Sequence, residues 1–407
     1  MTAAQQESTM DLQRRAGRGP AWSVAAGICG IFLLGFGVPE AFPPDGQWDF
    51  ETYYHAVEVY DAGGNPWDRD QLVDVAGPRV LNFIYPHHTF VFFRLFALDD
   101  LSTAKTVYLL AKLGCVVVLC VLWATCFVPR GVRGWFLAFA ALGYSATIWR
   151  DLVAGNVSLF EQTLIWFGVF ALLRGRLWLF CVLIILAAQF KILPICLLGL
   201  VLLSDSPHKW RYFSGSVVAC ALAAGGIYLT NPDAIRMFLH SASTVGGAEP
   251  GGDVNPCALA LIREVTADIL ERFTMLDAAS ARSTAYLPYA VYVLAVLLAL
   301  ARCIRGGRDI RSAVFLGILT YALITPRMKD YSYVLLLLPT FELIRARMGL
   351  ARSGRMLPIA LAVILTLPEL DYLWQYRPLL LAVWTWTIAL TMDVAEPRRE
   401  GVPSPSG

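Results

Sequence analysis

Charged residues are scarce in this sequence. Only 16% of its 407 residues are Asp, Glu, Lys or Arg, whereas 57% are hydrophobic; a soluble domain carries roughly 25% charged residues. The formal net charge is +2 at pH 7, which is too small to indicate a nucleic-acid partner. These shortages exclude an ordinary soluble domain and favour a membrane protein.

Paired cysteines and metal-ligand spacings are also missing. Seven of the nine cysteines lie in apolar runs, Cys303 lies at a predicted helix end, and Cys257 stands alone in a polar loop. We interpret all nine as small apolar residues. His87 and His88 are adjacent, so both cannot face one ion from a regular element. We therefore expect no metal site, no disulfide and no cofactor.

The N-terminus has no signal-peptide cleavage site. Residues 1–20 are polar and contain three arginines, and the apolar run that follows ends at Pro39-Glu40 without the small residues of a cleavage site. This pattern predicts a retained membrane anchor.

Long apolar runs, by contrast, recur along the whole chain. They lie near residues 21–39, 105–128, 135–149, 157–173, 177–203, 212–229, 286–303, 311–325, 331–346, 355–370 and 378–394. As helices, runs of this kind cross a bilayer core of roughly 30 Å. Lys191 and Pro194 interrupt the run 177–203, and proline removes a helical hydrogen bond. We predict a break there and about twelve transmembrane or re-entrant helical segments.

The distribution of charge predicts the orientation in the cell membrane. Basic residues gather in the short connections, and most acidic residues lie in two long ones, 40–104 and 230–285. Positive loops stay in the cytoplasm, and the break near Lys191 puts all the basic clusters on one side. We predict cytoplasmic tails at 1–20 and 395–407, one transmembrane domain over 21–394, and both long loops outside.

The first outer loop carries an acidic, tyrosine-rich stretch. Residues 50–62 are predicted to form a helix that Asp49 caps and Gly63-Gly64 ends. Asp49 is also suited to be a general base at the membrane surface, and both interpretations stay open on this pattern alone. Helical spacing puts Tyr53 on the same face, and Tyr53 and Tyr54 supply hydroxyls of the kind that bind sugars.

Lys191 is the strongest single signal. A lysine in the middle of a membrane helix costs on the order of 2.5–3.5 kcal/mol. At a break that opens outward it suits a phosphate group, and the alternative is a lysine that snorkels at a helix end. The cluster Arg327, Lys329, Asp330 and Tyr331 adds two cations on the outside, although an ordinary short loop would also explain it.

Further stretches combine polar and aromatic residues. Around Tyr85 the chain forms either an interfacial turn or part of a site. Arg150 and Asp151 lie at an outer helix junction, where they would pair with each other or with solvent. Asn156 is a normal cap for the next helix, and the glycine-rich stretch 246–252 is a connector or a lid.

Taken in order, these motifs resemble the polyprenol-phosphate-mannose-dependent mannosyltransferases of glycosyltransferase family 87, membrane enzymes of the GT-C fold. The resemblance covers residues 20–345. It rests on Asp49, Tyr53-Tyr54, Gly63-Gly64-Asn65-Pro66-Trp67, Tyr85-Pro86-His87, Gly155-Asn156-Val157-Ser158, Arg174-Gly175-Arg176, Lys191-Ile192-Leu193-Pro194, Asn255, Arg263 and Thr325-Pro326 through Tyr331. His87 replaces a second proline of the family pattern, and Asn156 replaces a glutamine.

The resemblance implies an all-α, GT-C-like hexosyltransferase that works without a metal. Asp49 would be the catalytic base, and Lys191, Arg327 and Lys329 would bind the donor phosphate. Substrate-binding residues would be Tyr53, Tyr54, Tyr85, His87, Asn156, Asn255, Arg263, Asp330 and Tyr331. A polyprenyl-phosphate sugar would donate mannose to an outward-facing glycolipid or polysaccharide among the membrane lipids. Transfer of another sugar such as arabinofuranose, or a lipid or glycan transporter, are the alternatives.

Overall fold

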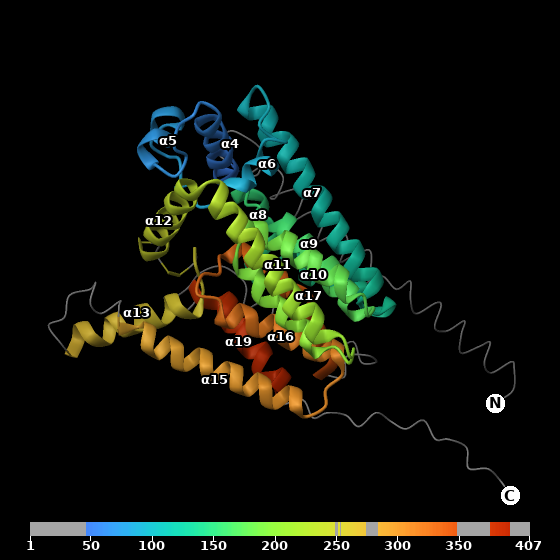
Figure 1. Cartoon of the computed structure of the whole chain (residues 1–407). Helices are drawn as coiled ribbons and strands as arrows, with labels where there is room; N and C mark the ends of the chain where they lie inside the picture. The colour runs from blue at the N-terminus through green and yellow to red at the C-terminus, as the bar shows by residue number, and fades with distance from the viewer. Residues whose placement is uncertain (1–45, 249–250, 253, 274–283, 348–374, 391–407) are drawn as a thin grey trace, which may run out of the picture.

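The computed structural model describes residues 46–248, 251–252, 254–273, 284–347 and 375–390 (Figure 1). Within these ranges every regular element is a helix, which confirms the predicted all-α class. The predicted segments 21–39 and 355–370, both predicted tails and the last residues of segment 378–394 lie outside the described ranges.

Three described helices are long and apolar enough to cross a membrane: α7 (Leu101–Cys126), α11 (Lys209–Thr230) and α15 (Tyr286–Arg305). At ~1.5 Å per residue, α7 is about 39 Å long. Asp100 starts α7 by accepting a hydrogen bond from Thr103 N at 2.8 Å. Helices α11 and α15 bury few side chains within the protein, so their apolar surface is available to lipid. The chain is a membrane protein.

Further helices complete the bundle. They are η3 (Arg130–Val132), α8 (Arg133–Ala154), α9 (Ser158–Leu173), α10 (Leu177–Phe190), η4 (Leu193–Leu203), α16 (Ile310–Ile324), η5 (Asp330–Leu336), α17 (Leu337–Arg347) and α19 (Arg377–Leu390). The bundle has one core, in which Trp123, Trp166 and Tyr333 are fully buried. The count of about twelve segments stays a prediction.

Both predicted outer loops are helical. The first contains α4 (Trp48–Asp61), α5 (Arg69–Ala76), η2 (His87–Thr89) and α6 (Phe90–Phe93); the second contains α12 (Pro232–Ala248) and α13 (Ala258–Phe273). Residues 46–100 and α12, which we call the cap, enclose a second core that includes Phe50, Phe83 and Phe238. Figure 1 shows α4, α5 and α12 together at one end of the molecule. The glycine-rich stretch is shorter than predicted, because residues 246–248 belong to α12.

Helix α4 begins at Trp48, so the prediction that Asp49 is its N-cap was wrong. The N-cap is Gln47, in the left-handed region at φ 64°, and Asp49 lies in the first turn. Gln47 N donates to Val153 O at 2.6 Å. A Cβ atom on Gly155 would lie 2.9 Å from the Gln47 Cα atom, so this glycine permits the close contact. The start of α4 is thereby held against the junction of α8 and α9.

The predicted break in segment 177–203 is present. Helix α10 ends at Phe190, Lys191 is extended at φ −140° and ψ 133°, and Pro194 lies at the start of η4. A second irregularity lies inside α8, where Tyr144, Ser145 and Ala146 all have positive φ between 54° and 60°. This left-handed turn sets the direction of the last two turns of α8, which reach the end of the bundle next to α4.

Candidate active site

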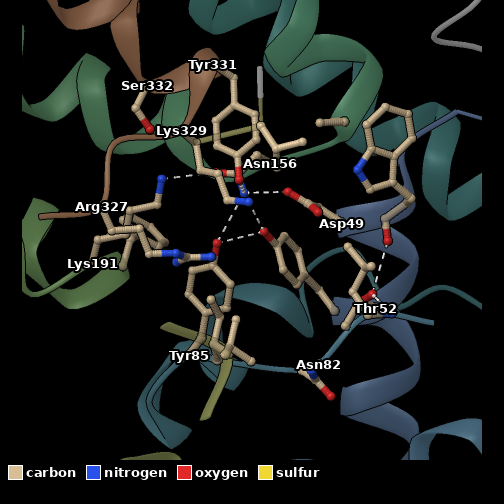
Figure 2. Close-up of a pocket in the computed structure, with 18 of the residues that line it drawn as sticks. Asp49, Thr52, Asn82, Tyr85, Asn156, Lys191, Arg327, Lys329, Tyr331 and Ser332 are labelled. Carbon is tan, nitrogen blue, oxygen red and sulfur yellow. Dashed lines mark hydrogen bonds between the residues drawn. The ribbon is translucent and has the colours of Figure 1, made fainter. Parts of the chain in front are cut away.

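A cavity of about 780 Å³ lies where the cap meets the bundle (Figure 2). Seven segments line it: α4, the loop 81–85, the α8–α9 junction, the break at 190–193, α12, the connection at Val254, and residues 327–332. Its volume falls in the range of small-molecule sites, roughly 300–1,000 Å³. Contact between the two cores therefore creates the site, because neither core encloses it alone.

Most of the predicted site residues meet in this cavity. They are Asp49, Tyr53, Tyr85, Asn156, Lys191, Arg327, Lys329, Asp330 and Tyr331. In Figure 2, Asn156 lies at the centre, Asp49 lies on one side of it, and Lys191, Arg327 and Lys329 gather on the other. The acid and the cations are thus separated across one cavity.

Two predicted residues of the cap point elsewhere. The Tyr54 hydroxyl donates to Leu98 O at 2.9 Å, inside the cap. His87 starts η2 and does not line the cavity. Burial lowers the pKa of both His87 and His88, and His88 Nε2 contacts Gln189 O at 3.1 Å. This turn therefore braces the end of α10 instead of lining the site.

Asn255 and Arg263 also lie outside the cavity lining. The Asn255 Oδ1 atom accepts a hydrogen bond from Met328 N at 3.1 Å, which fixes the loop that carries Arg327 and Lys329. The Arg263 guanidinium lies over the Tyr286 ring, 4.9 Å from its centroid. Asn255 therefore supports one wall of the cavity without lining it.

The Asn156 side chain connects the two sides of the cavity. Its Nδ2 atom donates to Asp49 Oδ2 at 2.6 Å and is 3.0–3.3 Å from the hydroxyls of Tyr53, Tyr85 and Tyr331. The Tyr53 and Tyr85 hydroxyls are hydrogen-bonded to each other at 2.8 Å. Helix α9 begins at Ser158 and its N-cap position is Val157. Asn156 lies one residue before that position, and its Oδ1 atom accepts a hydrogen bond from Ser158 N at 3.0 Å, the contact expected of a capping side chain.

The surroundings of Asp49 shift its pKa in both directions, and burial has the largest effect. Burial raises the pKa of Asp49 above its ordinary value of 3.8, while the hydrogen bond from Asn156 and the charges of Lys329, Lys112 and Lys191 act in the opposite direction. A carboxylate with a raised pKa is a stronger base than an exposed one. Asp49 can therefore accept a proton more readily than an exposed aspartate.

Lys191 is held by polar groups and remains open to the cavity. Its Nζ atom donates to Asn156 Oδ1 at 3.2 Å and to Ser158 Oγ. The Glu161 carboxylate lies 3.4 Å away, and the Tyr331 ring lies beneath the ammonium with its centroid at 5.5 Å. The Glu161 carboxylate in α9 balances this charge and was not recognised in the sequence.

Cations outnumber carboxylates in the lining. Arg150, Lys191, Arg327 and Lys329 face the cavity with only Asp49 and Asp330 as acids. Arg150 pairs with Asp330 at 2.8 Å, so the predicted alternative that Arg150 pairs with Asp151 was wrong. An excess of positive charge in a concave site favours an anionic ligand.

Asp151 instead forms a closed ion pair with Lys112, which the sequence analysis missed. The Lys112 Nζ atom lies 2.5 Å from Asp151 Oδ1 and also donates to Asp151 O; neither side chain is exposed. The available signal was a lysine in the middle of the long apolar helix α7. Among the described residues, no group of three or more His, Cys, Asp and Glu side chains could hold a metal ion.

The fold and the cavity define a helical membrane protein with an acid and a group of cations facing one site. A model of glycosyltransferase family 87 matches residues 83–326, more than half of the chain. The chain belongs to glycosyltransferase family 87 and is a glycosyltransferase. Tyr85, Asn156 and Lys191 lie inside the matched stretch, whereas Asp49 and Lys329 lie outside it. No curated protein and no solved structure matches the chain.

Proposed function

We propose that this glycosyltransferase moves a hexose, mannose in the first instance, from a polyprenyl-phosphate sugar to an outward-facing glycolipid or polysaccharide. The carrying observation is that Asp49 and the cations face each other across one cavity at the junction of cap and bundle. Such a site holds the two groups that a single displacement from a phosphate-linked sugar requires.

The donor end follows from the break after α10. Lys191 directs its ammonium into the cavity, whereas the next residue, Ile192, is 54% exposed. Phe190, Leu193 and Phe238 continue the apolar lining. A lipid phosphate needs a cation for its anionic head and an apolar surface for its chain, and the two are consecutive here. A nucleotide sugar would leave this apolar surface uncovered.

The reaction would proceed in one step. Asp49 takes the proton from the acceptor hydroxyl, the acceptor oxygen bonds to the anomeric carbon, and the bond from that carbon to the phosphate oxygen breaks. The polyprenyl phosphate leaves as an anion with both electrons of that bond and needs no proton. Lys191, Arg327 and Lys329 stabilise its charge. Attack from the face opposite the leaving group inverts the anomeric centre.

Sugar binding would use the hydroxyls between the two ends. Burial raises the pKa of Tyr53 and Tyr85, so both stay protonated and can donate to a sugar. Tyr331 and the Arg150–Asp330 pair line the same space. The mechanism does not depend on the sugar, so arabinofuranose transfer would use the same groups.

The test is turnover by the full-length protein in nanodiscs. Radiolabelled polyprenyl-phosphate mannose, the corresponding glucose and arabinofuranose lipids, and GDP-mannose are offered with membrane lipid extract as acceptor. We expect transfer from a lipid donor only, with an inverted anomeric centre in the product by NMR. Movement of the lipid donor between leaflets without any transfer would establish the transporter alternative instead.

A further inference from the structure

The hydrogen bonds of Asn156 are unusually complete. The residue is 2% exposed. Its Oδ1 atom accepts from Ser158 N at 3.0 Å, Ser158 Oγ at 2.7 Å and Lys191 Nζ at 3.2 Å. Its Nδ2 atom faces the Asp49 carboxylate and three tyrosine hydroxyls. An amide has two N–H donors and two lone pairs, so the protein alone saturates both ends.

These contacts also fix which way the amide points. The Ser158 N–H and the Lys191 ammonium can only donate, so they require the oxygen on their side. The Asp49 carboxylate can only accept, so it requires the nitrogen. A flipped amide would put oxygen against carboxylate and N–H groups against ammonium. The side chain is therefore locked between the acid and the cation.

We propose that Asn156 is a positioning residue. Its amide fixes the position of the Asp49 carboxylate relative to the Lys191 ammonium, and other groups bind the sugar. This inference rests on the proposed function, in which Asp49 is the base and Lys191 contacts the phosphate. It revises the substrate-binding role that the family resemblance implies for Asn156. A saturated amide can bind a sugar only by giving up one of these contacts.

The effect on Asp49 has a definite sign. Donation from Asn156 stabilises the carboxylate and so lowers the pKa of Asp49 against the effect of burial. The other titratable groups that interact electrostatically with Asp49 are the cations Lys112, Lys191 and Lys329, the carboxylate of Asp151, and the hydroxyls of Tyr53, Tyr85, Tyr108 and Tyr331. Replacing Asn156 with the similarly sized Leu keeps all of these titratable groups in the protein and removes only the contacts that the amide makes with them.

The kinetic test compares Asn156→Leu with Asn156→Gln in the full-length protein. For Asn156→Leu we expect kcat to fall at least tenfold, the KM for donor and acceptor to stay within threefold, and the acid limb of the rate profile to move to higher pH. Asn156→Gln keeps the amide on a longer arm and should recover part of the rate. A rise in KM with an unmoved acid limb would overturn the proposal in favour of substrate binding.

The matched control is Gln162→Leu, which removes another buried amide in α9 whose Nε2 donates to Ser332 O at 3.0 Å. Gln162 does not line the cavity, so its loss should affect stability without moving the acid limb. If Gln162→Leu moves the limb as far as Asn156→Leu does, the effect is structural and the proposal fails.

A readout without substrate separates this inference from the proposed function. Infrared titration, with the Asp49→Asn protein subtracted, follows protonation of the Asp49 carboxyl. We expect its midpoint to move to higher pH in Asn156→Leu, and an unmoved midpoint would overturn the positioning role. If the wild type transfers no sugar from any lipid donor while the midpoint still moves, the contact stands and the proposed reaction falls.

Discussion

Two lysines in apolar helical segments have opposite environments in this protein. Lys112, in the middle of α7, is fully buried and its ammonium contacts Asp151 at 2.5 Å. Lys191, at the end of α10, keeps 26% of its side chain exposed, and its nearest carboxylate, in Glu161, is 3.4 Å away. The first charge is closed off by a partner, whereas the second faces a cavity.

This difference in exposure and in carboxylate distance indicates which of the two lysines can bind a ligand. A buried pair with good geometry has no site left for a ligand, and removing one partner leaves an uncompensated charge. A partly exposed cation with a longer contact can bind an anion without losing its own support. Helix α8 contributes to both, since Arg150 lines the cavity and Asp151 contacts Lys112. Substitution in the closed pair, Lys112 and Asp151, should therefore lower stability. Substitution of Asp49 or Lys191, which line the cavity, should lower catalysis.

The largest effect is expected at Asp49, the carboxylate that faces the cations across the cavity. Asp49→Asn keeps the shape but cannot take a proton, so kcat should fall by about 10²–10⁴ in a folded protein that still binds donor. Single-turnover assays with purified protein measure this. Asp74→Asn, an exposed acid in α5, is the control and should keep the wild-type rate. A near wild-type rate in Asp49→Asn would remove the base from the mechanism.

The pH dependence of the wild type sharpens the same point. Because burial raises the pKa of Asp49 above 3.8, the rate should rise with pH through a midpoint above that value. The folded state holds this proton more tightly than the unfolded state, so Asp49 favours folding at low pH. That contribution is lost as the pH rises through the raised pKa. Asp49→Asn should abolish this part of the pH dependence of the melting temperature.

The second effect is on stability. Lys112→Met strands the buried Asp151 carboxylate, and breaking such a pair costs about 3–5 kcal/mol. Thermal unfolding in nanodiscs should show a large loss. The double variant Lys112→Met with Asp151→Leu replaces both charges by apolar groups and should recover most of it. If Lys112→Met unfolds like the wild type, the closed pair does not exist in the folded protein.

The contrast between the two lysines also shows what the sequence could predict. Lys191 was found because Pro194 follows it and breaks an apolar run, which is a local signal. Lys112 has no such neighbour, and its partner Asp151 lies on another helix, so only the packing of α7 against α8 reveals the pair. The helices and the break followed from local patterns in the same way.

The candidate site could be predicted in part. Asp49, Lys191 and Lys329 were selected from charge in outer segments, and the structure brings all three to one cavity. Asn156 was selected too, but its contacts with both sides depend on the close approach of Gln47 to Gly155. The Asp49 cap was mispredicted because the left-handed Gln47 is the N-cap and α4 begins two residues earlier than predicted. Such contacts join segments about a hundred residues apart and leave no periodic signal.

The third effect is on donor binding by Lys191, the partly exposed cation of the cavity. Lys191→Met keeps the stem and removes a charge-assisted contact worth about 1.5–3 kcal/mol, so apparent donor affinity should fall roughly ten- to hundredfold. Donor titrations with melting curves in parallel measure this. Arg236→Met, at an exposed cation of α12 outside the cavity lining, should leave donor affinity unchanged. Unchanged donor dependence in folded Lys191→Met would remove Lys191 from the phosphate site.

The smallest effect concerns the left-handed turn of α8. This turn directs the end of the helix that contributes Arg150 to the cavity and Asp151 to the closed pair. At Ala146, with φ 56°, a side chain costs roughly 1–2 kcal/mol relative to the right-handed helix, and glycine does not bear that cost. Glycine loses about 0.4–1 kcal/mol through the greater freedom of the unfolded chain. We expect Ala146→Gly to stabilise the protein by about 0.5–1 kcal/mol, with the rate unchanged.

The matched control lies five residues earlier in α8. Ala141 and Ala146 are both 9% exposed, but Ala141 has ordinary helical geometry, since the non-helical residues of α8 are 143–146. Ala141→Gly should therefore destabilise by about 1 kcal/mol, the opposite sign to Ala146→Gly. Melting curves of the two variants side by side decide the question. If both glycines destabilise equally, α8 is continuous at Ala146, and its last turns cannot present Arg150 and Asp151 to their two partners as described here.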